Sequence, residues 1–212
     1  MTAAYLKRED ISEEIKQQAI ETPPDELRTS ISVQAKVSLE QQVEIFQKRN
    51  GVACFSELHD SLLMWSHYSD GGRGFCLEFS TDNELFAKVE KVDYSDQMPR
   101  FDPAQILLLK EVPNIEKLYS TKSESWSYER EWRVIHQDSG VKYFYPGEIL
   151  TGIYFGPRVD NAALEMICTI IQGQNPNVRF WKGERVEGKF ELYFREFQYT
   201  NAVEAGKMKE SS

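Results

Sequence analysis

Glycine is missing from the first fifty residues of this 212-residue chain, and the first glycine is Gly51. A long stretch without glycine that repeats apolar residues every third or fourth position is typical of amphipathic helices. Ile11, Ile15 and Ala19 form one such series, which the prolines after Thr22 interrupt. A second apolar stripe comprises Leu27, Ile31, Ala35, Leu39, Val43 and Phe46. We therefore predict a helical hairpin whose second stripe is buried, against the main domain or another copy of the protein.

Short strands and turns replace this pattern after residue 51. A strand is predicted where Phe75, Leu77 and Phe79 alternate with other residues and share one face. The run from Thr151 to Phe155 is predicted as a fully buried strand that the following Gly-Pro pair ends. Strands clustered with few intervening helices favour an α+β fold with a mixed, mostly antiparallel sheet and an N-terminal helical hairpin.

The same patterns divide the chain into three parts. We predict that residues 1–50 are a helical extension packed on the core, that residues 51–200 are the core domain, and that residues 201–212 are a disordered tail. The helices of the extension are also the predicted surface for a protein partner or for a homo-oligomer.

The charge of the chain limits its partners. It has 34 acidic and 25 basic residues and a net charge of −9, which disfavours general binding to nucleic acid or to a membrane surface. Its apolar runs are shorter than the roughly 20 residues that cross a bilayer, and its polar N-terminus has no signal-peptide core. Cys54, Cys76 and Cys168 lie far apart in apolar runs and are predicted to be reduced and buried. These features predict a cytoplasmic protein.

Two carboxylates and an arginine alternate between Trp126 and Arg133. On a strand, Glu129, Glu131 and Arg133 would share one face, and Trp132 would lie on the opposite, buried face. Carboxylates about 7 Å apart suit a site where one stabilises an oxocarbenium-like transition state and the other moves a proton. The alternative is a solvated strand face with a glutamate–arginine pair worth ~0–1 kcal/mol.

A second stretch, residues 64–79, is dense in side chains that donate hydrogen bonds, stack or titrate. Ser66, His67, Tyr68 and Arg73 lie within it, and nearby glycines allow a ligand to approach the backbone. Arg73 could therefore meet a phosphate or carboxylate. The alternative is a tight helix–turn–strand connection that contains a hydrogen-bonded core histidine.

The sequence predicts no metal site. Its histidines and cysteines lack the spacing of zinc ligands. Glu78, Asp93, Glu129 and Glu131 could in principle gather Mg²⁺ in a nuclease-like site, but nothing in their spacing favours it.

These residues together carry a resemblance to a known family. The segments Leu63–Tyr68 and Gly74–Phe79, with the later Trp-x-Tyr-Glu-x-Glu-Trp-Arg pattern, resemble the bacterial family called domain of unknown function 2971. The resemblance covers roughly residues 52–197. Members usually open with a tyrosine-rich strand and an Asn-Asp-Pro-Phe-like segment, which this sequence lacks. Either the protein lacks part of the usual site or the chain is a shortened form.

The family's Glu-x-Glu strand and aromatic-rich site are similar to the ADP-ribosyltransferase fold, in which a strand-borne glutamate grips the nicotinamide ribose of NAD. This similarity implies an NAD-using site in a defence or toxin role. Glu131 would bind the ribose and stabilise the developing cation, and Glu129 would position or deprotonate the acceptor. The implied NAD-binding residues are Ser66, His67, Tyr68, Arg73, Trp126 and Arg133. The competing hypothesis is a non-catalytic module that senses a small-molecule ligand or binds a protein.

The sequence makes one prediction about two adjacent residues between Trp126 and Arg133. Glu131→Gln should abolish NAD chemistry and leave the fold intact, because glutamine keeps the size of the side chain but loses its charge. Trp132→Ala should mainly unfold the protein, at a cost of roughly 3–5 kcal/mol, if Trp132 faces the core. Assays of NAD consumption and melting curves of both variants measure the two effects.

Overall fold

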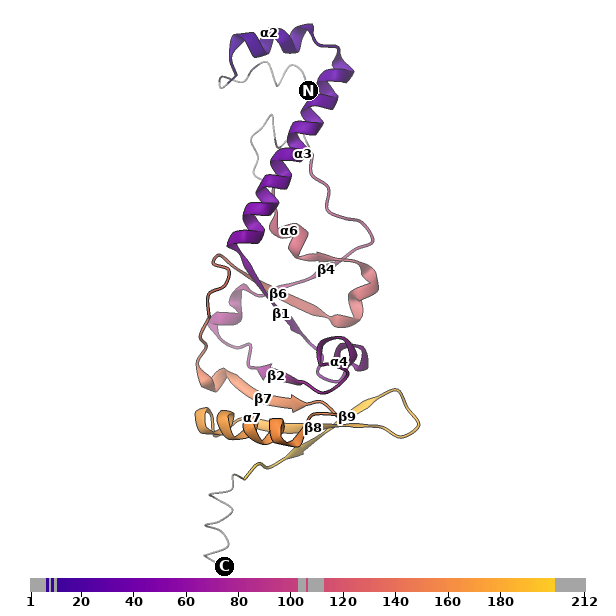
Figure 1. Cartoon of the computed structure of the whole chain (residues 1–212), viewed down its shortest axis with the longest axis vertical. Helices are drawn as coiled ribbons and strands as arrows, with labels where there is room; N and C mark the ends of the chain where they lie inside the picture. The colour runs from indigo at the N-terminus through magenta and orange to yellow at the C-terminus, as the bar shows by residue number, and fades with distance from the viewer. Residues whose placement is uncertain (1–6, 8, 10, 103–105, 107–112, 201–212) are drawn as a thin grey trace, which may run out of the picture. The chain divides into compact units, whose positions relative to one another are not determined.

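The computed structural model describes residues 7, 9, 11–102, 106 and 113–200 (Figure 1). The chain divides into two compact units built from interleaved segments. The first holds the described residues of 1–54, 90–127 and 133–141, and the second those of 55–89, 128–132 and 142–212. The predicted boundary near residue 50 remains a prediction, and the predicted tail, 201–212, lies outside the described residues.

Two helices open the first unit, as predicted. Helix α2 spans Glu13–Glu21 and helix α3 spans Pro24–Arg49. The side chain of Ser12 accepts a hydrogen bond from the N–H of Ile15 and begins α2. Ala19, Leu27 and Ile31 form a buried cluster between the helices. Of the predicted stripe on α3, the first three residues are buried and the rest are partly buried: Leu27, Ile31 and Ala35, then Leu39, Val43 and Phe46.

Short strands complete the first unit. Strands β1 (Gly51–Ser56), β6 (Glu131–His136) and β3 (Glu90–Lys91) form a sheet in the order β1-β6-β3. Strands β4 (Asp93–Tyr94) and β5 (Thr121–Lys122) pair in parallel, next to helix α6 (Glu116–Tyr119). The aromatic rings of Phe46 and Tyr119 stack at 4.6 Å. The unit boundary falls within both β1 and β6, so each strand continues into the second unit.

A four-stranded sheet organises the second unit. It contains β2 (Phe75–Phe79), β7 (Leu150–Phe155), β8 (Arg179–Arg185) and β9 (Leu192–Phe197), in that order. Strands β2 and β9 pair antiparallel with their neighbours, whereas β7 and β8 are parallel and connected through helix α7, Asn161–Gln174. The short elements are α4 (Leu62–Tyr68), η1 (Glu84–Lys88), η2 (Glu124–Glu129, which begins in the first unit) and η3 (Gly147–Ile149). The predicted α+β class with mixed, mostly antiparallel sheets is confirmed.

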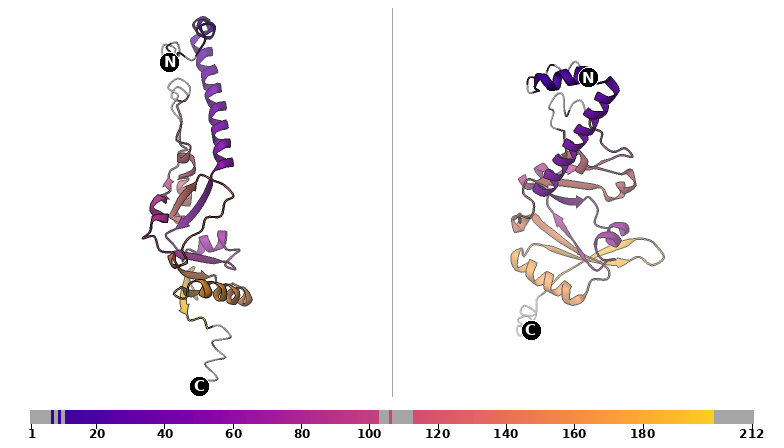
Figure 2. Two further views of the ribbon diagram at one scale, coloured as in Figure 1. Left: turned by 90° about the vertical axis from the view of Figure 1, so that its left-hand side faces the viewer. Right: turned by 45° about the horizontal axis from the view of Figure 1, so that its top comes forward.

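Helix α7 covers one face of this sheet (Figure 2). Ile153 and Phe155 on β7 are fully buried, together with Cys168 on the helix. The run predicted as a fully buried strand is therefore buried at these positions because the helix lies over it. Phe180 and Phe197 continue the same core across β8 and β9, where their rings stack at 6.0 Å.

The other face of the sheet carries a second core of aromatic residues. Tyr154 and Trp181 stack face to face, with ring centroids 4.4 Å apart and planes 4° from parallel. The Trp181 ring lies over Gly152, where a Cβ atom would come within 2.2 Å of it. Trp65 from α4 and Leu192 complete the buried cluster. Gly152 is thus required by the close approach of an aromatic ring.

The three cysteines differ more than the sequence suggested. Cys168 is fully buried, and its burial raises the pKa of the thiol to about 12. Burial, and then the nearby Glu78 carboxylate, raise the pKa of Cys76. Cys54 is exposed, so its predicted burial is wrong, because β1 turns this side chain outward despite its apolar sequence neighbours. Within the described ranges, no helix has both the length and the apolarity needed to cross a membrane.

Gly152→Ala should destabilise the protein by about 3 kcal/mol, because the ring of Trp181 cannot move away without breaking its stack on Tyr154. Gly173→Ala is the matched control: it lies in α7 with no atom within 4 Å of an added Cβ, and alanine should stabilise the helix by roughly 0.5–1 kcal/mol. Urea unfolding of both variants measures the difference. Equal stability of Gly152→Ala and the parent would contradict this packing.

Candidate functional site

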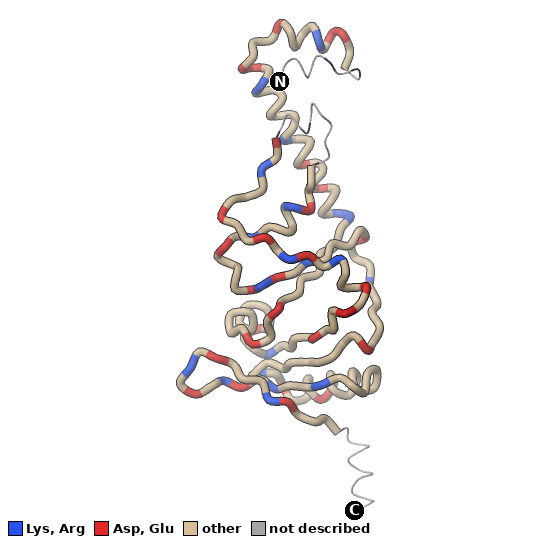
Figure 3. Tube along the Cα trace, turned by 180° about the vertical axis from the view of Figure 1, so that it is seen from behind, with Lys and Arg blue, Asp and Glu red and all other residues tan. Residues whose placement is uncertain are grey.

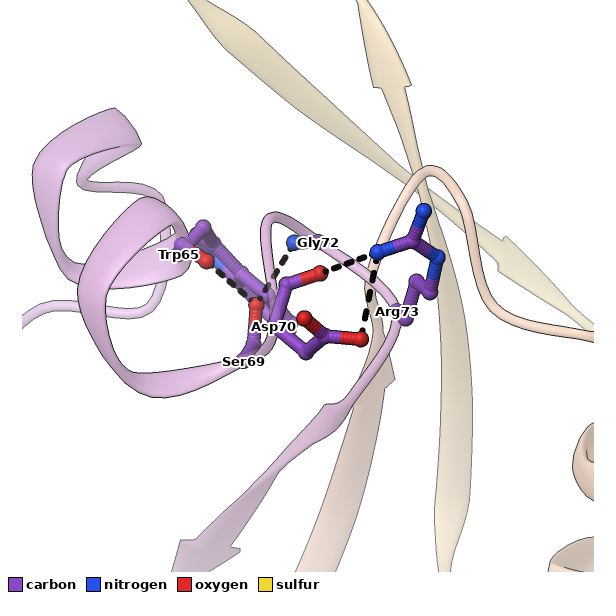
Figure 4. A network of polar contacts seen from close by, with 5 residues as sticks. All are labelled: Trp65, Ser69, Asp70, Gly72 and Arg73. Carbon is purple, nitrogen blue, oxygen red and sulfur yellow. Dashed lines mark hydrogen bonds and ion pairs between the residues drawn. The ribbon is translucent and has the colours of Figure 1, made fainter.

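Helix α4 and the turn after it hold much of the predicted stretch of residues 64–79, in the second unit (Figure 4). Trp65 is buried, and its indole N–H donates to the carbonyl of His59 at 2.6 Å. The hydroxyl of Ser69 donates to the carbonyl of Trp65 and accepts from the N–H of Gly72, which closes the turn. Gly71 and Gly72 both have positive φ, 64° and 88°, a backbone conformation that glycine adopts without strain. The predicted helix–turn–strand connection is therefore present.

Arg73 folds back on this turn. Its guanidinium donates to the carbonyl of Asp70 at 3.2 Å and pairs with the Asp70 carboxylate at 3.1 Å (Figure 4). Both side chains are more than half exposed, so the pair contributes little to stability. Arg73 remains accessible to solvent on the surface of the second unit.

Ser66 and His67 are exposed on α4. The Ser66 hydroxyl donates to the carbonyl of Leu62, within its own helix. The His67 ring lies 6.3 Å from the ring of Tyr68, edge to face. His67 is therefore not the core histidine of the alternative interpretation, because it lies on the outer surface of the helix.

Tyr68 joins the two predicted stretches. Its hydroxyl donates a hydrogen bond to Oε1 of Glu129 at 2.7 Å. The Glu129 residue is only 2% exposed, whereas Tyr68 is 63% exposed. The accessible Tyr68 thus contacts the buried Glu129 carboxyl group. Glu131, two residues further along the chain, is buried as well, at 5%.

The two glutamates do not share a strand face, so this part of the sequence prediction is wrong. Helix η2 ends at Glu129, Arg130 has a positive φ of 43°, and β6 begins only at Glu131. The left-handed residue between them changes the chain direction, which breaks the period-two alternation.

Strand β1 and the residue after it hold this turn in place. The Ser56 hydroxyl donates to the carbonyl of Glu129 at 2.6 Å, and the N–H of Glu57 donates to the carbonyl of Arg130 at 3.3 Å. The Ser56 hydroxyl also accepts from the N–H of Leu58. Backbone groups on both sides of Glu129 and Arg130 are therefore anchored, and the glutamate side chain is directed inward.

The burial predicted for Trp132 is also wrong. Trp132 is only partly buried, and its indole N–H donates to the Glu57 carboxylate at 2.8 Å, near solvent. The neighbouring Glu131 is buried instead. The turn at Arg130 determines which residues of β6 face inward, and Glu131 is the first of them. Trp132→Ala should therefore cost about 1–2 kcal/mol, well below the cost of removing a core tryptophan.

Trp126 and Arg133 belong to the first unit, whereas Tyr68, Glu129 and Glu131 belong to the second. Trp126 is 38% exposed, and the Lys122 ammonium lies 4.8 Å from the centre of its ring. Arg133 donates to the carbonyl of Tyr119. Each of these two residues is thus held by a local contact within its own unit.

Sequence reasoning missed a stack of four planar groups in the second unit. The His59 ring lies 4.4 Å from Tyr154, Tyr154 lies 4.4 Å from Trp181, and the Arg179 guanidinium lies 4.8 Å from the centre of the Trp181 ring. His59, Tyr154 and Trp181 are far apart in the sequence, so no local pattern indicates the stack. His59 at one end is exposed, and it is two residues from Glu57, which contacts the Arg130 turn.

Glu78 lies beside this stack as a second part-buried carboxylate. It accepts hydrogen bonds from the hydroxyls of Tyr154 and Thr151, each at 2.7 Å, and lies 3.7 Å from the guanidinium of Arg179. Burial, and then the hydrogen bond to Glu78, raise the pKa of the Tyr154 hydroxyl. Tyr154 is therefore a donor that keeps its proton, which suits a structural role.

No group of three or more histidine, cysteine or acidic side chains in the described ranges is arranged to hold a metal ion. The magnesium alternative named Glu78, Asp93, Glu129 and Glu131, and these four residues form no such group among the described residues. Figure 3 shows that acidic and basic residues are interspersed along the described chain.

One family model matches the chain. The family described as Protein of unknown function (DUF2971) matches residues 64–134, which confirms the resemblance predicted from the sequence over that segment. The matched segment contains every site residue predicted above, including Tyr68, Glu129 and Glu131. None of the curated proteins and none of the solved structures compared with the chain matches it.

Tyr68→Phe should destabilise the protein by about 2 kcal/mol, because the buried Glu129 carboxyl group loses a hydrogen-bond donor while little apolar contact is lost. Tyr193→Phe is the control, since Tyr193 is similarly exposed, at 59%. Denaturant unfolding followed by tryptophan fluorescence compares the two. A Tyr68→Phe variant as stable as Tyr193→Phe would show that the hydroxyl does not matter to Glu129.

Proposed function

We propose that Glu129, Glu131 and Tyr68 form the centre of an ADP-ribosyltransferase-like site that cleaves the bond between ribose and nicotinamide in NAD. One observation carries the proposal: two buried glutamates lie on either side of a left-handed residue, and an accessible tyrosine hydroxyl donates to one of them. Buried carboxyl groups are costly in a fold and are frequent at functional sites. Two buried glutamates two positions apart are therefore explained more simply by a chemical role than by a purely structural one.

The chemistry follows from where charge develops. When nicotinamide leaves with the bonding electron pair, the ribose acquires oxocarbenium character, which a nearby carboxylate stabilises. Glu131 is assigned this role. Glu129 is assigned the role of general base. It accepts the proton of the incoming acceptor (a hydroxyl, an amine or water), and the acceptor forms the new bond to the ribose. Both are shielded from water, so their electrostatic effect on bound substrate is stronger than at the surface.

The remaining site residues are proposed to bind the rest of NAD. The exposed ring of Tyr68 offers a surface for a planar group, and Ser66 and His67 lie beside it on the same short helix. Arg73 can leave its weak surface pair with Asp70 for a pyrophosphate, which is a stronger partner for a guanidinium. The proposed site is confined to the second unit and leaves out Trp126 and Arg133, which belong to the first unit.

An NAD-consuming activity of this kind would serve a defence or toxin role in the cytoplasm, where NAD is available. This role extends the proposal and depends on the activity itself.

A second function, a protein-binding module, is favoured by a separate observation. Helix α3 exposes Val33, Val37 and Ile45, which are 57%, 47% and 55% accessible and recur on one side of the helix. In such a module, the bonds among Ser56, Glu129 and Tyr68 would serve only to hold the fold.

NAD consumption by the full chain, with a thermal shift in the presence of NAD, tests the enzymatic proposal. Wild type should release nicotinamide, and Glu131→Gln should lower the rate by at least about 100-fold, as expected when a charge that stabilises the transition state is removed. Glu165→Gln, a change at an exposed glutamate on α7, should leave the rate unchanged.

Two results would favour the protein-binding module instead. One is equal turnover in wild type and Glu131→Gln. The other is no turnover together with no stabilisation by NAD at concentrations that stabilise a true binder by about 2.7 kcal/mol.

A further inference from the structure

A cavity of about 490 Å³ lies in the second unit, away from the glutamates. It falls in the range of small-molecule sites, roughly 300–1,000 Å³. Its lining residues come from the segment before β7, from β7 itself and from the end of α7: Tyr143, Phe144, Tyr145, Gly147, Leu150, Ile171, Gln174 and Asn175.

Asn175 fixes the end of α7 against the segment before β7. Its side-chain amide donates to the carbonyls of Gly147 and Leu150, at 3.0 and 2.8 Å. Its backbone N–H donates to the carbonyl of Ile171 at 2.8 Å. Because Asn175 is only 8% exposed and makes all three bonds, the base of the cavity is preorganised.

Three consecutive aromatic residues line the cavity. Tyr143, Phe144 and Tyr145 are 50%, 89% and 43% exposed. The Tyr145 ring meets Phe79 edge to face at 5.1 Å, which ties this segment to the sheet. Exposing three adjacent aromatic side chains at the mouth of a cavity is unfavourable in water, and a bound ligand would relieve it.

The electrostatics of the cavity select a positive ligand. The last turn of α7 ends here, and the final carbonyls of a helix carry about half a negative charge. The last turn of α7 contains no basic residue that would neutralise it, and none of the residues lining the cavity is charged. Aromatic faces also attract cations, and most strongly where water is partly excluded. The carbonyl end of the helix and the aromatic faces both disfavour an anion.

We propose that this cavity binds a small organic ammonium ion, with the aromatic segment 143–145 around the cation and the carbonyl end of α7 beneath it. This site does not depend on the proposed NAD chemistry, since it shares no residue with the Glu129–Tyr68 cluster.

Calorimetric titration of the full chain with choline tests the proposal, with 3,3-dimethylbutanol as its neutral isostere. Choline should bind at least about tenfold more tightly than the isostere, because only the cation gains from the aromatic faces and the helix end. Phe144→Ala should weaken choline binding about tenfold without unfolding the protein, since Phe144 is 89% exposed. Phe190→Ala, at a residue 94% exposed and outside the cavity, should leave binding unchanged.

Charge changes at the cavity lining give an independent readout. Gln174→Lys should weaken choline binding, and Gln174→Glu should strengthen it. Helix stability should change in the opposite direction, because a lysine at the C-terminal end of a helix stabilises the helix and a glutamate destabilises it. The proposal is overturned if choline and its isostere bind equally, if Phe144→Ala binds choline as wild type does, or if no choline binding occurs at millimolar concentration.

Discussion

Burial of the Glu129 and Glu131 side chains is the constraint around which the second unit is arranged. A carboxyl group inside a protein costs several kcal/mol unless other groups donate hydrogen bonds to it. Tyr68 supplies one such bond from α4, and Ser56 anchors the backbone of the same turn. The helix is positioned in turn by Trp65, which is buried in the aromatic cluster and bonded to His59. The Glu129 carboxyl group and the aromatic core are therefore both contacted by the same short helix.

This arrangement places Tyr68, on an accessible face of α4, in direct contact with the water-shielded carboxyl group of Glu129. Tyr68 and Trp65 are three residues apart on α4, and residues at this spacing lie on one side of a helix. One side chain is fixed in the core while the other bridges solvent and Glu129. A substrate that contacts Tyr68 would thus lie next to the Glu129 carboxyl group, which is shielded from water. The left-handed Arg130 is the strained element that permits this geometry.

The sequence predicts what depends on local pattern, and it fails where distant segments meet. The glycine-free start and its apolar stripe predict α3 well, because a helix is determined by residues close in the chain. The Tyr68–Glu129 contact joins residues 61 positions apart, which no local pattern indicates. The positive φ of Arg130 has no signature, since arginine rarely adopts it, and the error for Glu129 and Trp132 follows from that one residue. The His59–Tyr154–Trp181 stack joins residues more than twenty positions apart, beyond the reach of any periodicity.

The central claim is that the buried glutamate pair contacts the nicotinamide ribose of NAD. Saturation-transfer NMR of NAD in the presence of the full chain tests this contact without requiring turnover. The account predicts that protons of the nicotinamide riboside half receive the strongest transfer, and that Tyr68→Ala removes it while a control substitution at Tyr193 does not. The account would be contradicted if NAD received no transfer, or if its adenine half alone received it and Tyr68→Ala left the signal unchanged.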